Sequence, residues 1–301
     1  MKKILITGVN GLIGQAIGKV LLKQKGFKTY FTGIAACRIA NFKQNYVELD
    51  ISNKNQVEFV IGKLQPDVII NCAAISHVDV CEENHELCNK VNVFGVQNMV
   101  DVIQLRNNIK LIHLSSDFVF SGEKLNYVES DIPNPISAYG ISKLDGEKII
   151  QQNLSDYQII RTVLVYGFGE ALSRNNILTW VYQSLKQNKS ISVVNDQFRT
   201  PTYVEDLAEG IKKLVEKSEV GIFHISGSEP TSIYNFAKSI AKIFGFNEGL
   251  ISSISSNALN EKGKRPPKTG FSLQKVGTLI NFQPKSIIDG LSAAKKQLTS
   301  N

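Results

Sequence analysis

Three tyrosines in this sequence are followed by a lysine four residues later, a spacing that places both side chains on one face of a helix. The pairs are Tyr139/Lys143, Tyr182/Lys186 and Tyr234/Lys238. An ammonium group beside a phenol lowers the pKa of the tyrosine, which suits a tyrosine that transfers a proton. The last two pairs lie in late helical segments, and we interpret them as packed tyrosines with solvated lysines.

The first pair differs from the others because a serine, Ser116, precedes it at the end of a predicted strand. A hydroxyl at that strand end and a tyrosine on the next helix could converge on one carbonyl group. We therefore predict that Ser116, Tyr139 and Lys143 are catalytic. Ser116 would orient the substrate carbonyl, and Tyr139 would protonate its oxygen.

A second pattern is the glycine spacing G-x-x-G-x-x-G, which follows the first predicted strand and opens a helix. Gly8 allows a tight turn, Gly11 lets the backbone approach a pyrophosphate at the helix N-terminus, and Gly14 permits close packing of helix and strand. The same spacing is found in short-chain dehydrogenases. We predict a dinucleotide site that also includes the loop residues Asn10, Leu12 and Ile13.

The end of the second predicted strand distinguishes NAD from NADP. An NAD site usually has Asp or Glu there to bind the ribose 2′-hydroxyl, and residues 33–38 contain neither. Arg38 could instead meet a 2′-phosphate, so the sequence favours NADP and keeps NAD as the alternative. Asp50 and Ile51, after the third strand, are expected to contact the adenine. The other predicted cofactor contacts are Cys72, Ala73 and Ala74, whose small side chains leave room, and Asn92, Tyr139 and Lys143.

Short apolar runs that alternate with amphipathic helical patterns must position these residues. The runs predicted as strands are 3–7, 28–32, 46–49, 67–71, 111–115 and 158–162. Continuous hydrophobicity is typical of parallel strands buried on both faces, and a helix with one apolar face is predicted over 54–64. The fold class is therefore α/β: a Rossmann-type, doubly wound parallel sheet with a smaller C-terminal α/β substrate-binding region.

The pattern loosens in the second half, where helices are predicted over 176–187, 204–217 and 232–244. We assign residues 1–170 and 191–225 to an NADP-binding Rossmann domain, and residues 171–190 and 226–301 to a substrate-binding domain. Ligands of open α/β sheets bind beyond the carboxyl ends of the strands, so the site is expected between the two domains.

Composition excludes several classes of protein. Of the 301 residues, 43% are apolar and 20% are charged, unlike collagen-like, coiled-coil or disordered chains. The net charge of +7 is spread out without the basic block that would indicate nucleic acid, and no apolar run approaches the ~20 residues needed to span a bilayer.

The four cysteines lack a C-x-x-C pair, so we expect reduced thiols, no metal site and a cytoplasmic protein. A Ser-His-Asp hydrolase is disfavoured because G-x-S-x-G is missing, and the four histidines are interpreted as structural.

Six motifs in order carry a family resemblance that runs nearly the whole length. They are Gly8-x-x-Gly11-x-x-Gly14, Asn71 to Asp79, Leu114 to Gly122, Tyr139 to Glu147, Asp196 to Thr202 and Arg265-Pro266. Together they resemble the dTDP-4-dehydrorhamnose reductase family of extended short-chain dehydrogenases. The resemblance implies NADPH-dependent reduction of a nucleotide-linked 4-keto-6-deoxy sugar, most directly dTDP-4-dehydro-L-rhamnose to dTDP-L-rhamnose. Tyr139 would be the general acid, and Lys143 would hold the nicotinamide ribose. The residues expected to contact the substrate are Asp117, Asn176, Arg199 and Arg265. For each arginine, the alternative to a substrate contact is a surface salt bridge.

Three departures from the family keep other functions open. Leu164 and Ile233 stand where members commonly carry Trp near the sugar, and Arg199 stands where many have Gly, so another nucleotide sugar is an alternative. The regulatory β subunit of methionine adenosyltransferase is also similar, and it binds a partner enzyme with NADP as a stabilising ligand. A non-catalytic regulatory subunit is therefore the alternative from another class, beside epimerase or dehydratase chemistry. Some members of the family dimerise, so a homodimer is an expectation here.

Overall fold

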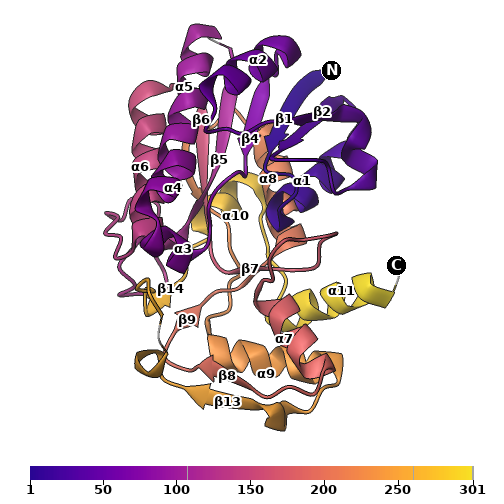
Figure 1. The fold of residues 1–301 in the computed structure, drawn as a ribbon, viewed down its shortest axis with the longest axis vertical. Coiled ribbons are helices and arrows are strands. Elements are labelled where there is room, and N and C mark those ends of the chain that lie inside the picture. The colour runs from indigo at the N-terminus through magenta and orange to yellow at the C-terminus, as the bar shows by residue number, and fades with distance from the viewer. Residues whose placement is uncertain (107, 260, 300–301) are drawn as a thin grey trace.

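A computed structural model describes residues 1–106, 108–259 and 261–299. It has a larger lobe built on a sheet and a smaller lobe beside the carboxyl ends of the sheet's strands (Figure 1). The N-terminal half of the chain forms most of the larger lobe. Segments from the second half form the smaller lobe, where the C-terminal helix also lies.

In the described part of the chain, seven parallel strands form the sheet of the larger lobe, in the order β11-β6-β5-β4-β1-β2-β3. The strand order reverses between β1 and β4, and ligands of doubly wound sheets bind at such a switch point. The strands are β1 (Lys2–Thr7), β2 (Phe27–Gly33), β3 (Tyr46–Glu48), β4 (Val68–Asn71), β5 (Lys110–Ser116), β6 (Tyr157–Thr162) and β11 (Gly221–His224).

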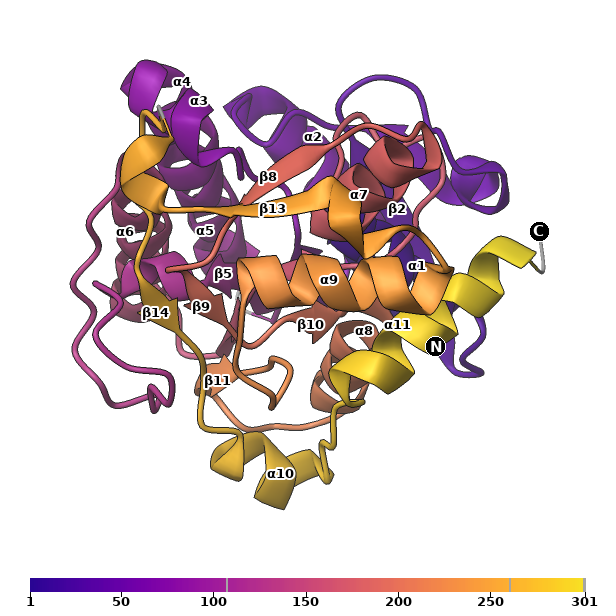
Figure 2. The same ribbon diagram turned by 90° about the horizontal axis from the view of Figure 1, so that it is seen from below.

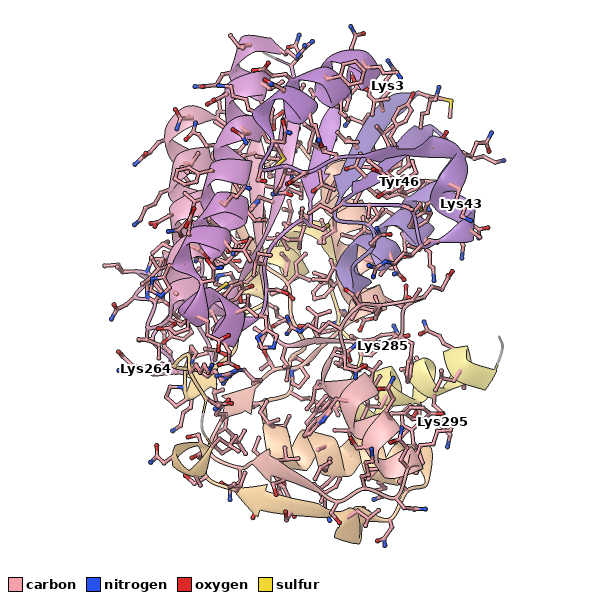
Figure 3. All side chains as sticks on the ribbon, viewed as in Figure 1. Lys3, Lys43, Tyr46, Lys264, Lys285 and Lys295 are labelled. Carbon is pink, nitrogen blue, oxygen red and sulfur yellow. The ribbon has the colours of Figure 1, made fainter. Side chains whose placement is uncertain are left out.

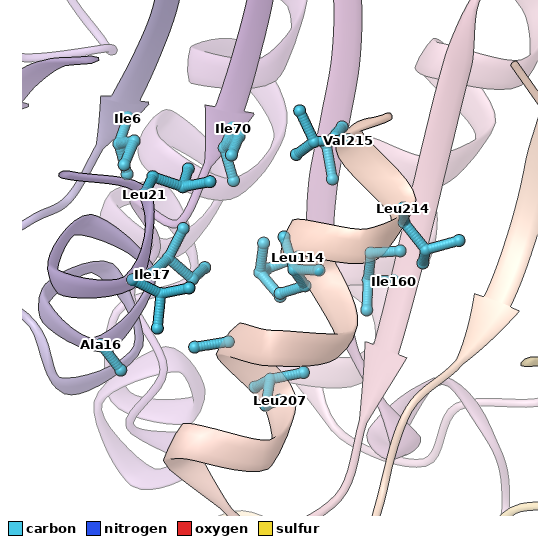
Figure 4. Packing of buried hydrophobic residues seen from close by; sticks show 14 of the residues in the cluster. Ile6, Ala16, Ile17, Leu21, Ile70, Leu114, Ile160, Leu207, Leu214 and Val215 are labelled. Carbon is cyan, nitrogen blue, oxygen red and sulfur yellow. The ribbon is translucent and has the colours of Figure 1, made fainter. Parts of the chain in front are cut away.

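Both faces of this sheet are buried under helices, because successive residues of a strand point to opposite faces. In β1, Ile4 and Ile6 belong to one core and Leu5 belongs to the other, and all three side chains are fully buried. Figure 4 shows the first core, in which Ile17 and Leu207 pack from two helices against the strands. The helices of that face are α1 (Leu12–Leu22), α8 (Val204–Val215) and α10 (Gln274–Ile280), and those of the other face are α2 (Lys54–Leu64), α5 (Gly95–Arg106) and α6 (Ala138–Asn153).

Side-chain caps fix where two of these helices begin. The Asn53 side chain accepts a hydrogen bond from the backbone nitrogen of Gln56 at the start of α2. Ser137 caps α6, its Oγ accepting from the backbone nitrogen of Gly140 at 3.2 Å. Since α6 begins there, Tyr139 lies in its first turn. The segment between β4 and β5 also holds α3 (Val78–Glu83), α4 (His85–Asn89) and a π-helical turn, η2 (Lys90–Phe94).

The smaller lobe has its own core around a parallel pair of strands, β8 (Ile191–Val194) and β13 (Ile251–Ile254). Its helices are α7 (Ile177–Lys186), α9 (Ile233–Phe244) and α11 (Ile287–Thr299). Figure 2 shows α9 running along β13 with α11 near its far end. The short strands are β7 (Val165–Tyr166), β9 (Phe198–Arg199), β10 (Thr202–Tyr203), β12 (Thr231–Ser232) and β14 (Lys268–Thr269), and the 3-10 turns are η1 (Ala40–Asn45), η3 (Asp117–Val119), η4 (Glu248–Leu250) and η5 (Ser256–Ala258).

The predicted fold class is confirmed, and each of the six predicted strands matches an observed strand to within one residue at either end. Two elements differ from the expectation. The seventh strand, β11, was not predicted because it has only four residues and begins with glycine. Residues 226–301 were assigned to the substrate-binding domain, but Val276 and Ile280 of α10 pack in the core of the larger lobe, a long-range contact that periodicity does not reveal.

Two further findings concern the described residues only. The four cysteines are free thiols. None of the helices described has both the length and the apolar character that a membrane span requires.

Candidate active site

The turn after β1 is narrow, and two glycines make it so. Gly8 has φ +69°, and a Cβ there would lie 2.8 Å from the backbone nitrogen of Ala73, just after β4. A Cβ on Gly14 would lie 2.6 Å from the carbonyl oxygen of Gly8, so α1 packs against the turn at a distance that needs glycine. Gly11 is the exposed N-cap of α1, with no side-chain cap. The first N–H groups of α1 are therefore available to an anion such as a pyrophosphate.

Asn10 connects this turn to the loop after β2. Its Nδ2 donates to the carbonyl oxygens of Ile34 and Ala36, each at 3.3 Å, and its Oδ1 accepts from the backbone nitrogen of Arg38 at 3.1 Å. Arg38 is exposed, and its guanidinium donates to the carbonyl oxygen of Ala171 at 3.2 Å. The structure thus brings Arg38 beside the glycine turn and gives Asn10 a positioning role that the sequence pattern did not show.

Side chains from β3 and the residues after it support the same loop. Tyr46 lies in the larger lobe, where Figure 3 labels it. Its hydroxyl donates to the carbonyl oxygen of Gly33 at 2.9 Å. Asp50 accepts from the backbone nitrogen of Ser52 at 2.9 Å and from its hydroxyl at 2.8 Å, and Ile51 is buried. Asp50 is half-buried, so one side of this short turn stays open to a ligand.

The residues after β4, Cys72, Ala73 and Ala74, are half-buried. Asn92 holds the chain that follows them. Its Oδ1 accepts from the backbone nitrogen of Ile75 at 2.9 Å, while its Nδ2 donates to the carbonyl oxygen of Ile75 at 2.9 Å and to the Ser142 hydroxyl at 3.0 Å. Because both atoms of the buried Asn92 amide bind protein groups, this residue positions the loop, and a direct cofactor contact would need a new hydrogen-bond partner.

Ser116 ends β5 and meets Tyr139 from α6, as the sequence predicted. The Ser116 side chain lies close enough to the Tyr139 phenol to lower its pKa, and the Ser116 hydroxyl donates to Oδ1 of Asp117 at 3.0 Å. The ring of Phe118 packs on Tyr139 edge to face, with 5.6 Å between centroids. Burial raises the pKa of Tyr139 well above its ordinary value of 10. The phenol therefore keeps its proton at neutral pH, which is the form that a general acid requires.

Lys143 lies one turn further along α6 and is buried, at 2% exposure. Its Nζ is 3.1 Å from Nε2 of His113, and burial lowers the pKa of Lys143 to about 8. The pKa of Tyr139 is raised in this structure, and not lowered as the tyrosine–lysine spacing predicts. The effect of burial on Tyr139 is larger, and the hydrogen-bond partner of Lys143 is His113.

Asp117 and Arg199 are buried against each other behind Ser116. Nε of Arg199 lies 3.7 Å from Oδ2 of Asp117, and the Thr269 hydroxyl donates to the same oxygen. Burial raises the pKa of Asp117, and the charge of Arg199 counteracts this shift. Arg199 also donates to the carbonyl oxygen of Phe198 at 2.7 Å. The alternative of a surface salt bridge is therefore wrong for Arg199, since both side chains are about 3% exposed.

The other two predicted substrate residues bind protein groups. Asn176 is the N-cap of α7 in a capping box, and its Nδ2 donates to the carbonyl oxygen of Gly167 at 2.8 Å. Arg265 donates to both carboxylate oxygens of Asp79, at 2.7 and 3.1 Å, and its Nε is 3.2 Å from Glu261. Arg265 thus forms the ion pairs that were its alternative role. Both side chains are therefore held by protein groups, and each keeps one N–H hydrogen that these bonds do not use.

Arg174 is a cation near Tyr139 that the sequence analysis missed. It is exposed, donates to the Ser76 hydroxyl at 3.3 Å, and forms no salt bridge with the residues described. Its charge lowers the pKa of Tyr139, against the larger opposite effect of burial. The residue directly precedes Asn175 and Asn176 at the start of a predicted helix, and no motif marked it.

The other two tyrosine–lysine pairs lie in the smaller lobe, on α7 and α9. The Tyr182 ring packs 5.3 Å from that of Phe244, with Lys186 Nζ 5.7 Å from the Tyr182 centroid. Lys238 similarly lies over the Tyr234 ring, at 6.0 Å. The tyrosines are packed and Lys186 is exposed, as predicted. Lys238 is half-buried and lies 3.5 Å from the Glu248 carboxylate, so the prediction of a solvated lysine is wrong for that pair.

Known proteins resemble this chain over most of its length. The family model described as RmlD substrate binding domain matches residues 1–300. A dTDP-4-dehydrorhamnose reductase of Aggregatibacter actinomycetemcomitans is 31% identical, with 94% of this chain and 95% of that protein covered. The methionine adenosyltransferase 2 subunit beta of Mus musculus is 30% identical, over 92% of this chain and 82% of that protein. Among solved structures, the dTDP-4-dehydrorhamnose reductase of Bacillus anthracis in complex with NADP has a TM-score of 0.87 and 30% identity, covering 99% of this chain and 100% of that one.

Proposed function

This chain belongs to the RmlD substrate binding domain family, and from that premise we propose that it is an NADPH-dependent reductase of a nucleotide-linked 4-keto-6-deoxy sugar. The substrate that fits best is dTDP-4-dehydro-L-rhamnose, with dTDP-L-rhamnose as product, because the similar reductases act in that reaction by name. The observation that carries the proposal is that Ser116 and Tyr139 come together at the carboxyl end of β5, in a sheet whose β1 ends in the glycine turn.

The residues present fit an NADP molecule. The uncapped N-terminus of α1 suits the pyrophosphate, and Gly8 and Gly14 keep the turn free of side-chain atoms. Exposed Arg38, held beside Asn10, suits the 2′-phosphate, and no carboxylate in residues 33–38 would repel it. NAD remains the alternative cofactor. When bound, the nicotinamide supplies the hydride for the keto carbon.

The protein's own groups would handle the proton of the reaction. Ser116 would orient the carbonyl oxygen through its hydroxyl, and the neutral phenol of Tyr139 would donate its proton to that oxygen. The charge of Arg174, just before α7, would stabilise the phenolate that remains. Lys143 lies one turn from Tyr139 on α6 and would add to this effect in its ammonium form. Asp117 is fixed by Arg199 and Thr269, so it holds Ser116 and is not free to act as a second acid.

The direct test is oxidation of NADPH by the purified protein with dTDP-4-dehydro-L-rhamnose as substrate. The reaction is monitored by the loss of the absorbance of reduced nicotinamide. We expect turnover that depends on both substrates. NADPH binding measured in parallel separates two failures. Binding without turnover on this sugar or on related 4-keto nucleotide sugars would contradict the reductase, and loss of binding would contradict the cofactor site.

A second candidate function rests on the similarity to methionine adenosyltransferase 2 subunit beta. In that case the chain would bind a methionine adenosyltransferase catalytic subunit, with NADP stabilising its fold. Size-exclusion chromatography of the two purified proteins, with and without NADP, tests this candidate. A stable complex together with absent turnover would favour the regulatory role, and turnover without a complex would exclude it.

A further inference from the structure

A chain of buried polar groups runs through the sheet beneath the candidate active site. It joins Thr7 at the end of β1, Asn71 at the end of β4, His113 in β5 and Lys143 on α6. His113 is fully buried and all four residues are at most 2% exposed. The proposed reaction mechanism uses Lys143 but gives no role to His113.

The partners of Asn71 determine which way its amide points. The backbone nitrogen of Ala73, which can only donate, lies 3.2 Å from Oδ1 of Asn71, and the Thr7 hydroxyl donates to the same oxygen at 2.6 Å. The amide oxygen therefore faces β1, and Nδ2 faces Nδ1 of His113 at 3.0 Å. Because Nδ2 is a donor, Nδ1 of His113 must accept.

A neutral imidazole that accepts at Nδ1 carries its proton on Nε2. Burial and the nearby charge of Lys143 hold the pKa of His113 well below its ordinary value, so the ring is neutral. The Nε2–H group of His113 is then directed at Nζ of Lys143, 3.1 Å away. An amine can accept this hydrogen bond, whereas an ammonium has no lone pair to accept it.

The other titratable groups around Lys143 are one carboxylate and three thiols, and the carboxylate is already paired. The Glu147 carboxylate favours the ammonium, but it binds Arg161 at 2.6 Å and the Ser115 hydroxyl. The thiols of Cys72, just after β4, Cys81 of α3 and Cys88 of α4 lie near enough to Lys143 to influence its pKa. Burial raises the pKa of the Cys72 thiol to about 12, so it stays neutral. The hydrogen bond between Cys81 and Cys88 raises the pKa of Cys81 and lowers that of Cys88. Negative charge on this pair favours the ammonium and acts against the contact from His113.

We propose that His113 is a positioning residue that directs an N–H donor at Lys143 and thereby disfavours the ammonium form of this lysine. The inference deepens the proposed function, since it concerns the lysine next to the general acid. Burial lowers the pKa of Lys143 to about 8 against nearby groups that raise it, and a donor aimed at Nζ acts in the same direction as burial. The ammonium supports the Tyr139 phenolate, so turnover should fall as the pH rises through the pKa of Lys143.

The first test reads the His113 ring and needs no substrate. Long-range ¹H–¹⁵N correlation spectra of the whole protein resolve the nitrogens of its four histidines, and His113→Gln identifies the His113 signals by their loss. We expect a neutral ring with its proton on Nε2 at every pH at which the protein is folded. A proton on Nδ1, or protonation of both nitrogens near neutral pH, would overturn the proposal.

The second test is the pH profile of turnover. Gln at position 113 can turn its carbonyl oxygen to Lys143, which favours the ammonium. We expect the alkaline limb of His113→Gln to lie about one pH unit above that of the wild type. His224→Gln is the matched control, because His224 is equally buried but hydrogen-bonds the Tyr127 carbonyl oxygen instead. A limb that stays in place in His113→Gln, or moves equally in both variants, would contradict the role of His113.

The two tests also separate this inference from the proposed function. If the wild type shows no turnover with any 4-keto nucleotide sugar, the reductase proposal fails, and the pH dependence of NADPH binding replaces the turnover profile. A shift of that dependence in His113→Gln but not in His224→Gln, together with the Nε2–H tautomer, would still support the contact between His113 and Lys143.

Discussion

The cofactor side and the substrate side of the candidate site are held in different ways. On the larger lobe the backbone itself forms the site: Gly8 adopts a positive φ, α1 starts without a side-chain cap, and Ser116 stands at a strand end. On the other side the predicted contacts are side chains that already have protein partners, such as Arg265 on Asp79. A site made by backbone geometry is ready to bind, whereas a side chain such as Arg265 has most of its hydrogen-bond donors already in use.

The largest expected effect is on the free energy of unfolding. It should differ between the loss of a buried ion pair in the larger lobe and the loss of a part-exposed pair on the substrate side. Glu147 binds Arg161 at 2.6 Å with both side chains at most 2% exposed. Glu147→Gln should reduce the free energy of unfolding by about 3–5 kcal/mol, because it leaves a buried guanidinium charge unpaired. Glu261→Gln, at the part-exposed Arg265, should cost less than about 1 kcal/mol. Denaturant unfolding measures both, and equal losses would remove the contrast.

A smaller effect is expected when alanine replaces either of two glycines that both have positive φ, and it should differ between the two positions. Gly8→Ala should cost about 3 kcal/mol of unfolding free energy and abolish NADPH binding, because the new Cβ would lie 2.8 Å from the backbone of Ala73. Gly245→Ala has open space around it and should cost only about 1–2 kcal/mol for its backbone conformation. Its NADPH binding should be normal. If Gly8→Ala bound NADPH like the wild type, the glycine turn would not be the pyrophosphate site.

The next effect concerns the choice of cofactor. Arg38→Ala should raise the dissociation constant for NADPH about 10–100-fold and change that for NADH little, since only NADPH carries the 2′-phosphate. Lys43→Ala, an exposed cation on η1, is the control and should affect neither (Figure 3). Isothermal titration with each cofactor measures the ratio. An equal loss for NADPH and NADH would show that Arg38 does not recognise the phosphate.

The smallest effect is a pH dependence on the substrate side. The hydrogen bond from Arg265 lowers the pKa of Asp79 to about 2, below its ordinary 3.8. A carboxyl whose pKa is lower in the folded state stabilises the fold above the unfolded pKa, and this contribution is lost as the pH falls from about 4 to 2. Asp79→Asn should therefore cost up to about 1 kcal/mol at neutral pH and less near pH 3. A loss that does not change with pH would contradict the ion pair.

Much of the larger lobe could be predicted because its signals are local. Buried parallel strands are continuous apolar runs, and Gly8 and Gly14 mark a turn by their spacing alone. The contacts on the substrate side could not be predicted, since they join residues far apart in sequence. Arg265 meets Asp79, and Arg199 meets Asp117, only because the smaller lobe folds against the strand ends. The role of His113 was missed for the same reason: an apolar strand pattern shows that a histidine is buried, but not that it faces Lys143.

The central claim is that Tyr139 acts as the general acid while an identical spacing in the smaller lobe does not act at all. The most direct measurement compares the rates at which the wild type, Tyr139→Phe and Tyr182→Phe oxidise NADPH with dTDP-4-dehydro-L-rhamnose as substrate. The NADPH affinity of each protein is determined in parallel. We predict that Tyr139→Phe loses at least about a hundredfold in kcat with nearly unchanged NADPH affinity, because it lacks only the proton donor. Tyr182→Phe should turn over like the wild type. Retained turnover in Tyr139→Phe, or an equal loss in both variants, would contradict the assignment.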